Sequence, residues 1–76
     1  MKVSVKYFAN MRDRMGRADE TVELDEGATV ASLWAKVSDE PMPENTLIAV
    51  NMEYTNTEEA LKDGDEVAFF PPVTGG

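Results

Sequence analysis

The sequence predicts an α+β fold in which a mixed sheet packs on one main helix. Three observations support this prediction: alternating apolar residues in two segments near the N-terminus, one segment of helical periodicity after them, and a length of 76 residues, which suits one small domain. Alternation places every second side chain on one face of a strand, and helical periodicity produces an apolar stripe along a helix. The strands and the helix can therefore bury their apolar faces against each other.

Two alternating segments near the N-terminus predict a β-hairpin. In residues 2–8 the apolar side chains fall mainly on one side, opposite charged and hydroxyl side chains, and residues 21–24 alternate in the same way. Between them, Met11 and Met15 stand four residues apart, which predicts a short helical turn that Gly16 ends.

The clearest helix is predicted for residues 29–38, where Thr29 is a suitable N-cap. Four apolar residues follow the i, i+3, i+4, i+7 spacing of one helix face: Val30, Leu33, Trp34 and Val37. A brief second helical segment is predicted for residues 57–62, since a threonine and two glutamates suit a cap and a first turn.

Two short strands complete the predicted order of elements, at residues 47–50 and 66–70. The order fits a β-grasp fold, in which the first two strands pair antiparallel and the helix lets the last strand lie parallel to the first. Two prolines follow the last strand and cannot extend it. We therefore predict a β-grasp domain over residues 1–70 and an extended tail over residues 71–76.

The composition excludes several classes of function. The chain has no Cys and no His, so it offers no thiol nucleophile, histidine-ligated metal or serine–histidine triad, and we expect no bound metal or cofactor. Its formal charge of −8 disfavours binding to nucleic acid or anionic membrane. No signal peptide or membrane span is evident, so we expect a soluble cytoplasmic protein.

The tail is the segment most indicative of function. Its prolines favour an extended chain of about 3.1 Å per residue, and Gly75 and Gly76 lack the Cβ atoms that would block a narrow channel. The tail can therefore present its terminal carboxylate to another protein, although a frayed terminus is the simpler alternative. The residues predicted to insert are Pro71, Pro72, Val73, Thr74 and Gly75, with Gly76 as the reactive residue.

Three aromatic residues are candidates for a partner interface. If the alternating apolar residues face the helix, Phe8 and Phe70 both point to the opposite face. Parallel pairing of the first and last strands would bring them together at the root of the tail. Scattered apolar surface residues are common, but a phenylalanine pair beside the tail favours an interface anchor, and we add Tyr54 to this surface.

Charged clusters support less specific interpretations. The acidic residues in 63–66 lack the twelve-residue spacing of an EF-hand, so we interpret them as a turn and its solvated flank. Arg12, Arg14 and Arg17 form a small basic cluster that could meet an acidic partner or simply be solvated. The sequence leaves these two alternatives open.

Residues 63–76, Asp-Gly-Asp-Glu-Val-Ala-Phe-Phe-Pro-Pro-Val-Thr-Gly-Gly, resemble the C-terminal signature of molybdopterin synthase small subunits, a family of ubiquitin-like sulfur carriers. Residues 2–9, followed by Arg12, resemble that family's first strand and loop. The resemblance spans the chain and is weakest over residues 38–46.

The resemblance implies a mechanism and a set of partners. A ubiquitin-activating-like adenylyltransferase would use ATP to adenylate Gly76, and a sulfur donor protein would convert it to a thiocarboxylate. The tail would then give its sulfur to cyclic pyranopterin monophosphate in the large subunit, within a heterotetramer. The chain would thus be the sulfur-donating subunit of a sulfurtransferase and no enzyme alone.

Three alternatives remain at this stage. The chain could be a ubiquitin-like modifier that forms isopeptide bonds, a sulfur carrier for thiamine thiazole, or a plain interaction domain with an inert tail. The sequence identifies neither the sulfur donor nor the activating enzyme.

Overall fold

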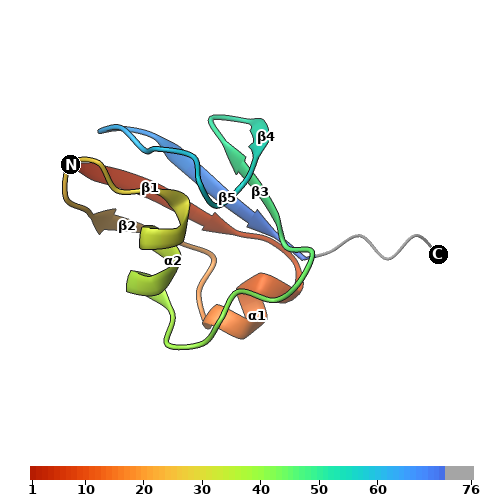
Figure 1. The fold of residues 1–76 in the computed structure, drawn as a ribbon. Helices are drawn as coiled ribbons and strands as arrows, with labels where there is room; N and C mark the ends of the chain where they lie inside the picture. The colour runs from red at the N-terminus through yellow and green to blue at the C-terminus, as the bar shows by residue number, and fades with distance from the viewer. Residues whose placement is uncertain (72–76) are drawn as a thin grey trace.

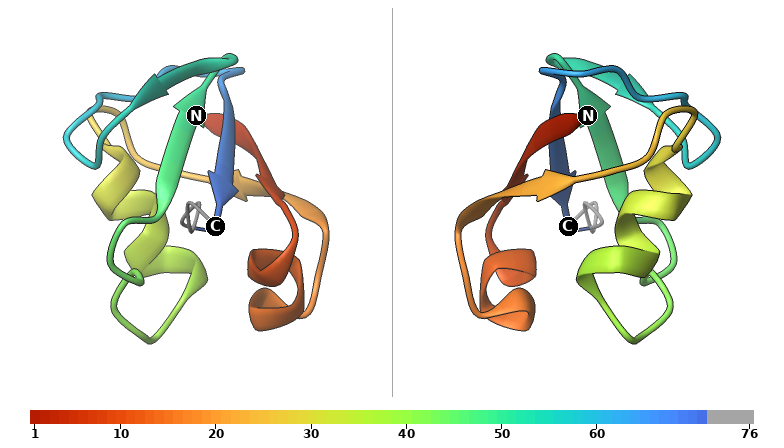
Figure 2. Two further views of the ribbon diagram at one scale, coloured as in Figure 1. Left: turned by 90° about the vertical axis from the view of Figure 1, so that its right-hand side faces the viewer. Right: turned by 90° about the vertical axis from the view of Figure 1, so that its left-hand side faces the viewer.

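A computed structural model describes residues 1–71 of the chain, in which a five-stranded mixed sheet packs against two helices (Figure 1). The elements of this described part are β1 (Lys2–Tyr7), α1 (Asn10–Met15), β2 (Asp19–Glu23), α2 (Val30–Val37), β3 (Leu47–Val50), β4 (Glu53–Thr55) and β5 (Glu66–Phe70). The strands are ordered β2-β1-β5-β3-β4, and both helices lie on the same face of the sheet (Figure 2). The opposite face, called the open face below, has no helix over it among residues 1–71.

Strand pairing confirms the predicted topology. β1 pairs antiparallel with β2 and parallel with β5, and β3 pairs antiparallel with β5. The parallel register places Tyr7 opposite Phe69. The C-terminal ends of β1 and β5 therefore lie at the same edge, far from the N-terminus (Figure 1).

The two predicted helices near residues 11–15 and 29–38 are confirmed. Thr29 and Ser32 form a reciprocal capping box, in which each side chain accepts a hydrogen bond from the other residue's backbone N–H. At the end of α2 the N–H of Ser38 donates to the carbonyl of Trp34. Helix α1 ends at Gly16, whose φ of 74° is the left-handed conformation that glycine adopts without strain.

The core lies between the sheet and the two helices. Phe69 is fully buried, and the Trp34 ring meets it edge-on with centroids 5.2 Å apart. The indole N–H donates to the carbonyl of Glu40 at 2.8 Å, so the buried polar atom is satisfied. The core cluster consists of Val3, Val5, Tyr7, Met11, Val22, Leu24, Val30, Leu33, Trp34, Ile48, Leu61, Val67 and Phe69.

The helical segment predicted for residues 57–62 is wrong. The carbonyls of Thr57 and Glu59 accept hydrogen bonds from Ala31 and Val30, at the first turn of α2, at 2.9 and 3.0 Å. Residue Ala60 forms an isolated bridge with the N-cap of α2. These carbonyls satisfy backbone donors that have no partner inside α2, so tertiary pairing outweighs the weak local helix signal.

One strand of the sheet, β4, was not predicted from the sequence. β4 (Glu53–Thr55) has only three residues, two of them exposed, which is too short for an alternating pattern to stand out. It pairs antiparallel with β3 and forms one edge of the sheet.

Candidate interaction surface at the root of the tail

An apolar surface occupies the open face of the sheet. Its members are four large side chains around two buried alanines: Phe8, Met52, Tyr54 and Phe70 around Ala49 and Ala68. We call these six residues the open-face patch. They line a hollow of about 370 Å³, bordered by an ion pair between Lys6 and Glu66 at 3.5 Å.

The two phenylalanines lie together as predicted. Their rings stack with centroids 4.7 Å apart and planes only 6° from parallel. Alternation along β5 turns Phe69 into the core and Phe70 to the open face, and the N–H of Phe8 donates to the carbonyl of Phe69 at 3.1 Å. The parallel pairing of the terminal strands thus creates this contact between residues 62 positions apart in the sequence.

Phe70 is less exposed than expected. Phe8 is 41% exposed and Tyr54 is 74% exposed, whereas Phe70 is only half-exposed. The reason is that Phe70 lies between the other two rings, with the Tyr54 centroid 6.3 Å away. Tyr54 is therefore part of the same surface, as predicted, while the partner-interface role of all three residues stays a prediction.

Met52 is the member of the patch that the sequence analysis missed. Met52 is 91% exposed, more than Phe8 or Tyr54, and it lines the same hollow. The available signal was its position directly after Asn51, in the short link between two strands, where an apolar residue is unusual.

The root of the tail adjoins the patch. Pro71, half-exposed, follows Phe70 directly and is the last residue that the structure describes. The predicted insertion residues Pro72, Val73, Thr74 and Gly75 and the predicted reactive Gly76 lie outside the described residues. Their roles remain predictions.

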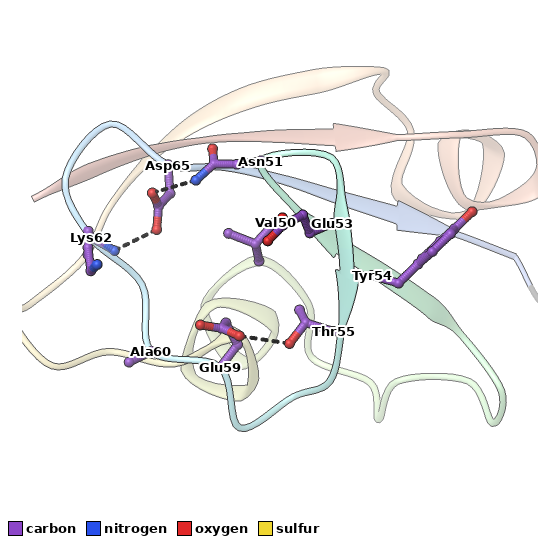
Figure 3. A pocket seen from close by; sticks show the side chains of 9 residues that line it. All are labelled: Val50, Asn51, Glu53, Tyr54, Thr55, Glu59, Ala60, Lys62 and Asp65. Carbon is purple, nitrogen blue, oxygen red and sulfur yellow. Dashed lines mark hydrogen bonds between the residues drawn. The ribbon is translucent and has the colours of Figure 1, made fainter.

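A second, polar hollow lies between the β3–β4 hairpin and residues 59–65 (Figure 3). Asp65 accepts hydrogen bonds from the Asn51 side-chain amide at 2.9 Å and the Lys62 backbone N–H at 2.8 Å. These bonds show that the acidic turn holds the hairpin in place, whereas the Tyr54 ring extends away from the hollow (Figure 3). Within residues 1–71 no group of three acidic side chains is placed to hold a metal ion.

Two of the three clustered arginines contact other parts of the described fold. Arg17 pairs with Glu20, donates to the carbonyl of Val37 at 3.2 Å, and places its guanidinium 5.7 Å from the Tyr7 ring centroid. Arg14 pairs with Glu40 at 3.4 Å. The exposed Arg12 makes no ion pair within residues 1–71 and lines a hollow next to Phe8.

Tyr7 has the clearest electrostatic perturbation among the described residues. Burial raises the pKa of its hydroxyl well above the usual range, and the hydrogen bond that it donates to Glu20 at 2.7 Å raises it further. The Glu20 carboxylate also raises the pKa of Arg17. The three residues therefore form a structural network beside β2.

A five-stranded mixed sheet over one main helix, with an apolar patch where β5 leads into a Gly-Gly tail, defines a ubiquitin-like β-grasp protein. The chain belongs to the ThiS family, whose profile matches residues 5–76.

Neither helix in residues 1–71 is long and apolar enough to cross a membrane.

Curated relatives share this chain's full length. A molybdopterin synthase sulfur carrier subunit from Chlamydomonas reinhardtii is 39% identical, with all of both chains covered. Its counterpart from Escherichia coli (strain K12) is 37% identical over 97% of this chain and 99% of its own.

Several solved structures have the same fold as this chain. Molybdopterin converting factor, subunit 1, from Pyrococcus furiosus has a TM-score of 0.82 at 41% identity, covering 96% of this chain and 99% of its own. Small archaeal modifier protein 1 from Haloferax volcanii has a TM-score of 0.82 at 26% identity, covering 95% and 98%. A complex of subunits 1 and 2 of the molybdopterin-converting factor from Helicobacter pylori contains a chain with a TM-score of 0.69 at 25% identity, and each chain is covered fully.

Proposed function

We propose that this protein is the sulfur-carrier subunit of molybdopterin synthase. The observation that carries the proposal is the stacked Phe8–Phe70 pair, which lies where β5 leads into the Gly-Gly tail. A partner that docks on this patch receives the tail in a defined direction. The full-length relatives named as sulfur carrier subunits support the same function.

The chemistry of the proposal centres on Gly76. A free carboxylate is a poor electrophile, so an adenylyltransferase related to ubiquitin-activating enzymes joins it to the AMP part of ATP and releases pyrophosphate. The AMP then serves as the leaving group. A sulfur donor protein transfers sulfide-level sulfur to the acyl carbon, AMP leaves, and Gly76 becomes a thiocarboxylate. In the large subunit this sulfur bonds to cyclic pyranopterin monophosphate, and hydrolysis of the acyl–sulfur bond returns Gly76 to a free carboxylate. The protein itself binds the large subunit, orients its own tail and delivers the sulfur.

The large subunit supplies the remaining catalytic groups in this proposal. The chain has no His or Cys, which are frequent general bases and sulfur nucleophiles. A heterotetramer of two small and two large subunits is the assembly we propose. The Helicobacter pylori complex of subunits 1 and 2 supports pairing with a large subunit.

Intact-mass analysis of the protein from its native host tests the carrier function. A mass raised by the difference between sulfur and oxygen, and lost on incubation with the large subunit and the pterin substrate, is the expected result. Sedimentation of the purified mixture should show the heterotetramer, and the chain alone should sediment as a monomer. A chain that never acquires sulfur would overturn the proposal.

A protein modifier is the second candidate function. The likeness to small archaeal modifier protein 1 favours it, because acyl adenylation of the terminal glycine serves modifiers and sulfur carriers alike. Ladders of covalent conjugates on lysines of other host proteins would identify a modifier.

A further inference from the structure

The hairpin that joins β3 and β4 has an unusual turn. Val50 pairs with Glu53, so only Asn51 and Met52 form the link. Both have positive φ angles, 51° and 71°, as a type I′ turn requires. Glycine is preferred at the second position, because a side chain there brings Cβ close to the following carbonyl oxygen.

In the described fold the pairing of β3 with β4 holds this turn, whereas the Met52 side chain itself offsets almost none of the strain. Asn51 tolerates the left-handed conformation, and its side chain bonds Asp65 and accepts from the N–H of Glu66. Met52, in contrast, is 91% exposed and contributes almost no buried area. A strained residue whose side chain stabilises nothing in its own fold points to a function outside that fold.

The Met52 side chain lies on the open-face patch. It lines the same hollow as Tyr54 and Phe70, and so extends the apolar surface from the root of the tail to the far hairpin. Methionine suits such a position because its unbranched, polarisable side chain adapts to the shape of a partner.

We propose that Met52 is a docking residue for the large subunit of molybdopterin synthase, and that the strained turn holds its side chain on the docking face. This inference rests on the proposed function. Continuity of the patch with the tail root favours the protein that receives the tail as the occupant. The exposed Glu53 beside Met52, and a formal charge of −8, predict a partner pocket that is apolar and edged by basic side chains.

Substitutions at Met52 should change stability and affinity in opposite directions. Met52→Gly and Met52→Asn relieve the strained φ, so the folding equilibrium constant should rise roughly twofold to fivefold for glycine, after its larger unfolded-state entropy is allowed for. Both remove the apolar side chain, so binding of the purified large subunit should weaken roughly tenfold. Met52→Leu keeps an apolar side chain and should retain most of the affinity.

Asn45→Gly is the matched control. Asn45 is also exposed with a positive φ of 63°, but it is absent from the open-face patch, so its substitution should leave affinity unchanged. Urea unfolding gives the stability of each variant, and titration calorimetry with the large subunit gives the affinity.

The outcomes of this experiment separate the docking role of Met52 from the carrier function of the protein. Normal affinity in Met52→Gly, with tight binding by the unaltered protein, overturns the role of Met52 and leaves the carrier function standing. If the unaltered protein forms a homodimer that Met52→Gly dissociates, Met52 contacts a second copy of the chain. If Met52→Gly weakens binding only to the adenylyltransferase, Met52 contacts that enzyme. Either result overturns the proposed docking of Met52 on the large subunit. No binding of the unaltered protein to the large subunit overturns the proposed function itself.

Discussion

Phe69 and Phe70 are neighbours in β5 but have different environments. We therefore expect Phe69 to contribute to folding stability and Phe70 to contribute to docking. Phe69 is fully buried between Tyr7 and Trp34, whereas Phe70 packs on Phe8 and Tyr54 and stays half-exposed. The cost of truncating each ring should differ accordingly.

We expect Phe69→Ala to lower the free energy of unfolding by about 3–5 kcal/mol, because it empties a site in the core. Phe70→Ala should cost clearly less, yet weaken binding to the large subunit by about 2 kcal/mol or more if the patch is an interface hot spot. Denaturant unfolding and calorimetric titration of both variants measure the two quantities. Unchanged affinity for Phe70→Ala would show that the patch is ordinary surface.

Tyr7 provides a prediction about alkaline pH. Its pKa is raised in the folded state, so the folded protein keeps a proton that the unfolded chain loses near the usual tyrosine value of about 10. Stability from this group is therefore complete below about pH 10 and falls as pH rises beyond it. Unfolding in urea at about pH 9 and about pH 11 should show this decline, and Tyr7→Phe should show less of it. An equal decline in both proteins would assign the effect to another group.

At the scale of elements, α2 depends on contacts at its N-terminus. Thr29 and Ser32 cap each other, and residues 57–59 accept the next backbone donors. The first turn of the main helix is thus tied both locally and to a distant loop.

Thr29→Ala should lower the free energy of unfolding by about 1 kcal/mol, since it removes one half of the capping box. Affinity for the large subunit should not change, because Thr29 caps α2, and α2 lies on the face of the sheet opposite the open-face patch. Thr29→Ser is the matched control, and it should keep most of the stability. A large loss of affinity in Thr29→Ala would mean that the helix face also takes part in docking.

At the scale of the whole molecule, folding and sulfur delivery depend on different parts of the chain. The core cluster of the described residues extends from Val3 to Phe69, and the tail begins only after β5. Changes at the tip of the tail should therefore affect activity without affecting folding.

Deleting Gly76, or replacing Gly75 with Val, should abolish sulfur transfer while leaving the thermal midpoint nearly unchanged. The deletion removes the reacting carboxylate from its position, and the valine adds a branched Cβ that would block a narrow channel. Molybdopterin formation in a reconstituted assay and thermal unfolding are the two measurements. A normally active chain that ends at Gly75 would contradict the carrier function.

The sequence by itself determined the elements with strong periodicity. Alternation in residues 2–8 predicted β1, and the apolar stripe of residues 29–38 predicted α2, because these local patterns match the core that forms. A tight turn before residues 66–70 and two prolines after them predicted β5. Parallel pairing of the terminal strands then followed from chain order, and with it the contact between Phe8 and Phe70.

Only the tertiary structure decided the features that depend on distant partners. Carbonyls of residues 57–59 bond to α2 and so do not form a helix, and Phe70 is partly covered by Tyr54 from another strand. The exposure of Met52 follows from a two-residue turn whose positive φ angles are set by the pairing of β3 with β4. Such long-range contacts contribute free energies that exceed local propensities. They cannot be predicted from a pattern that spans only a few residues.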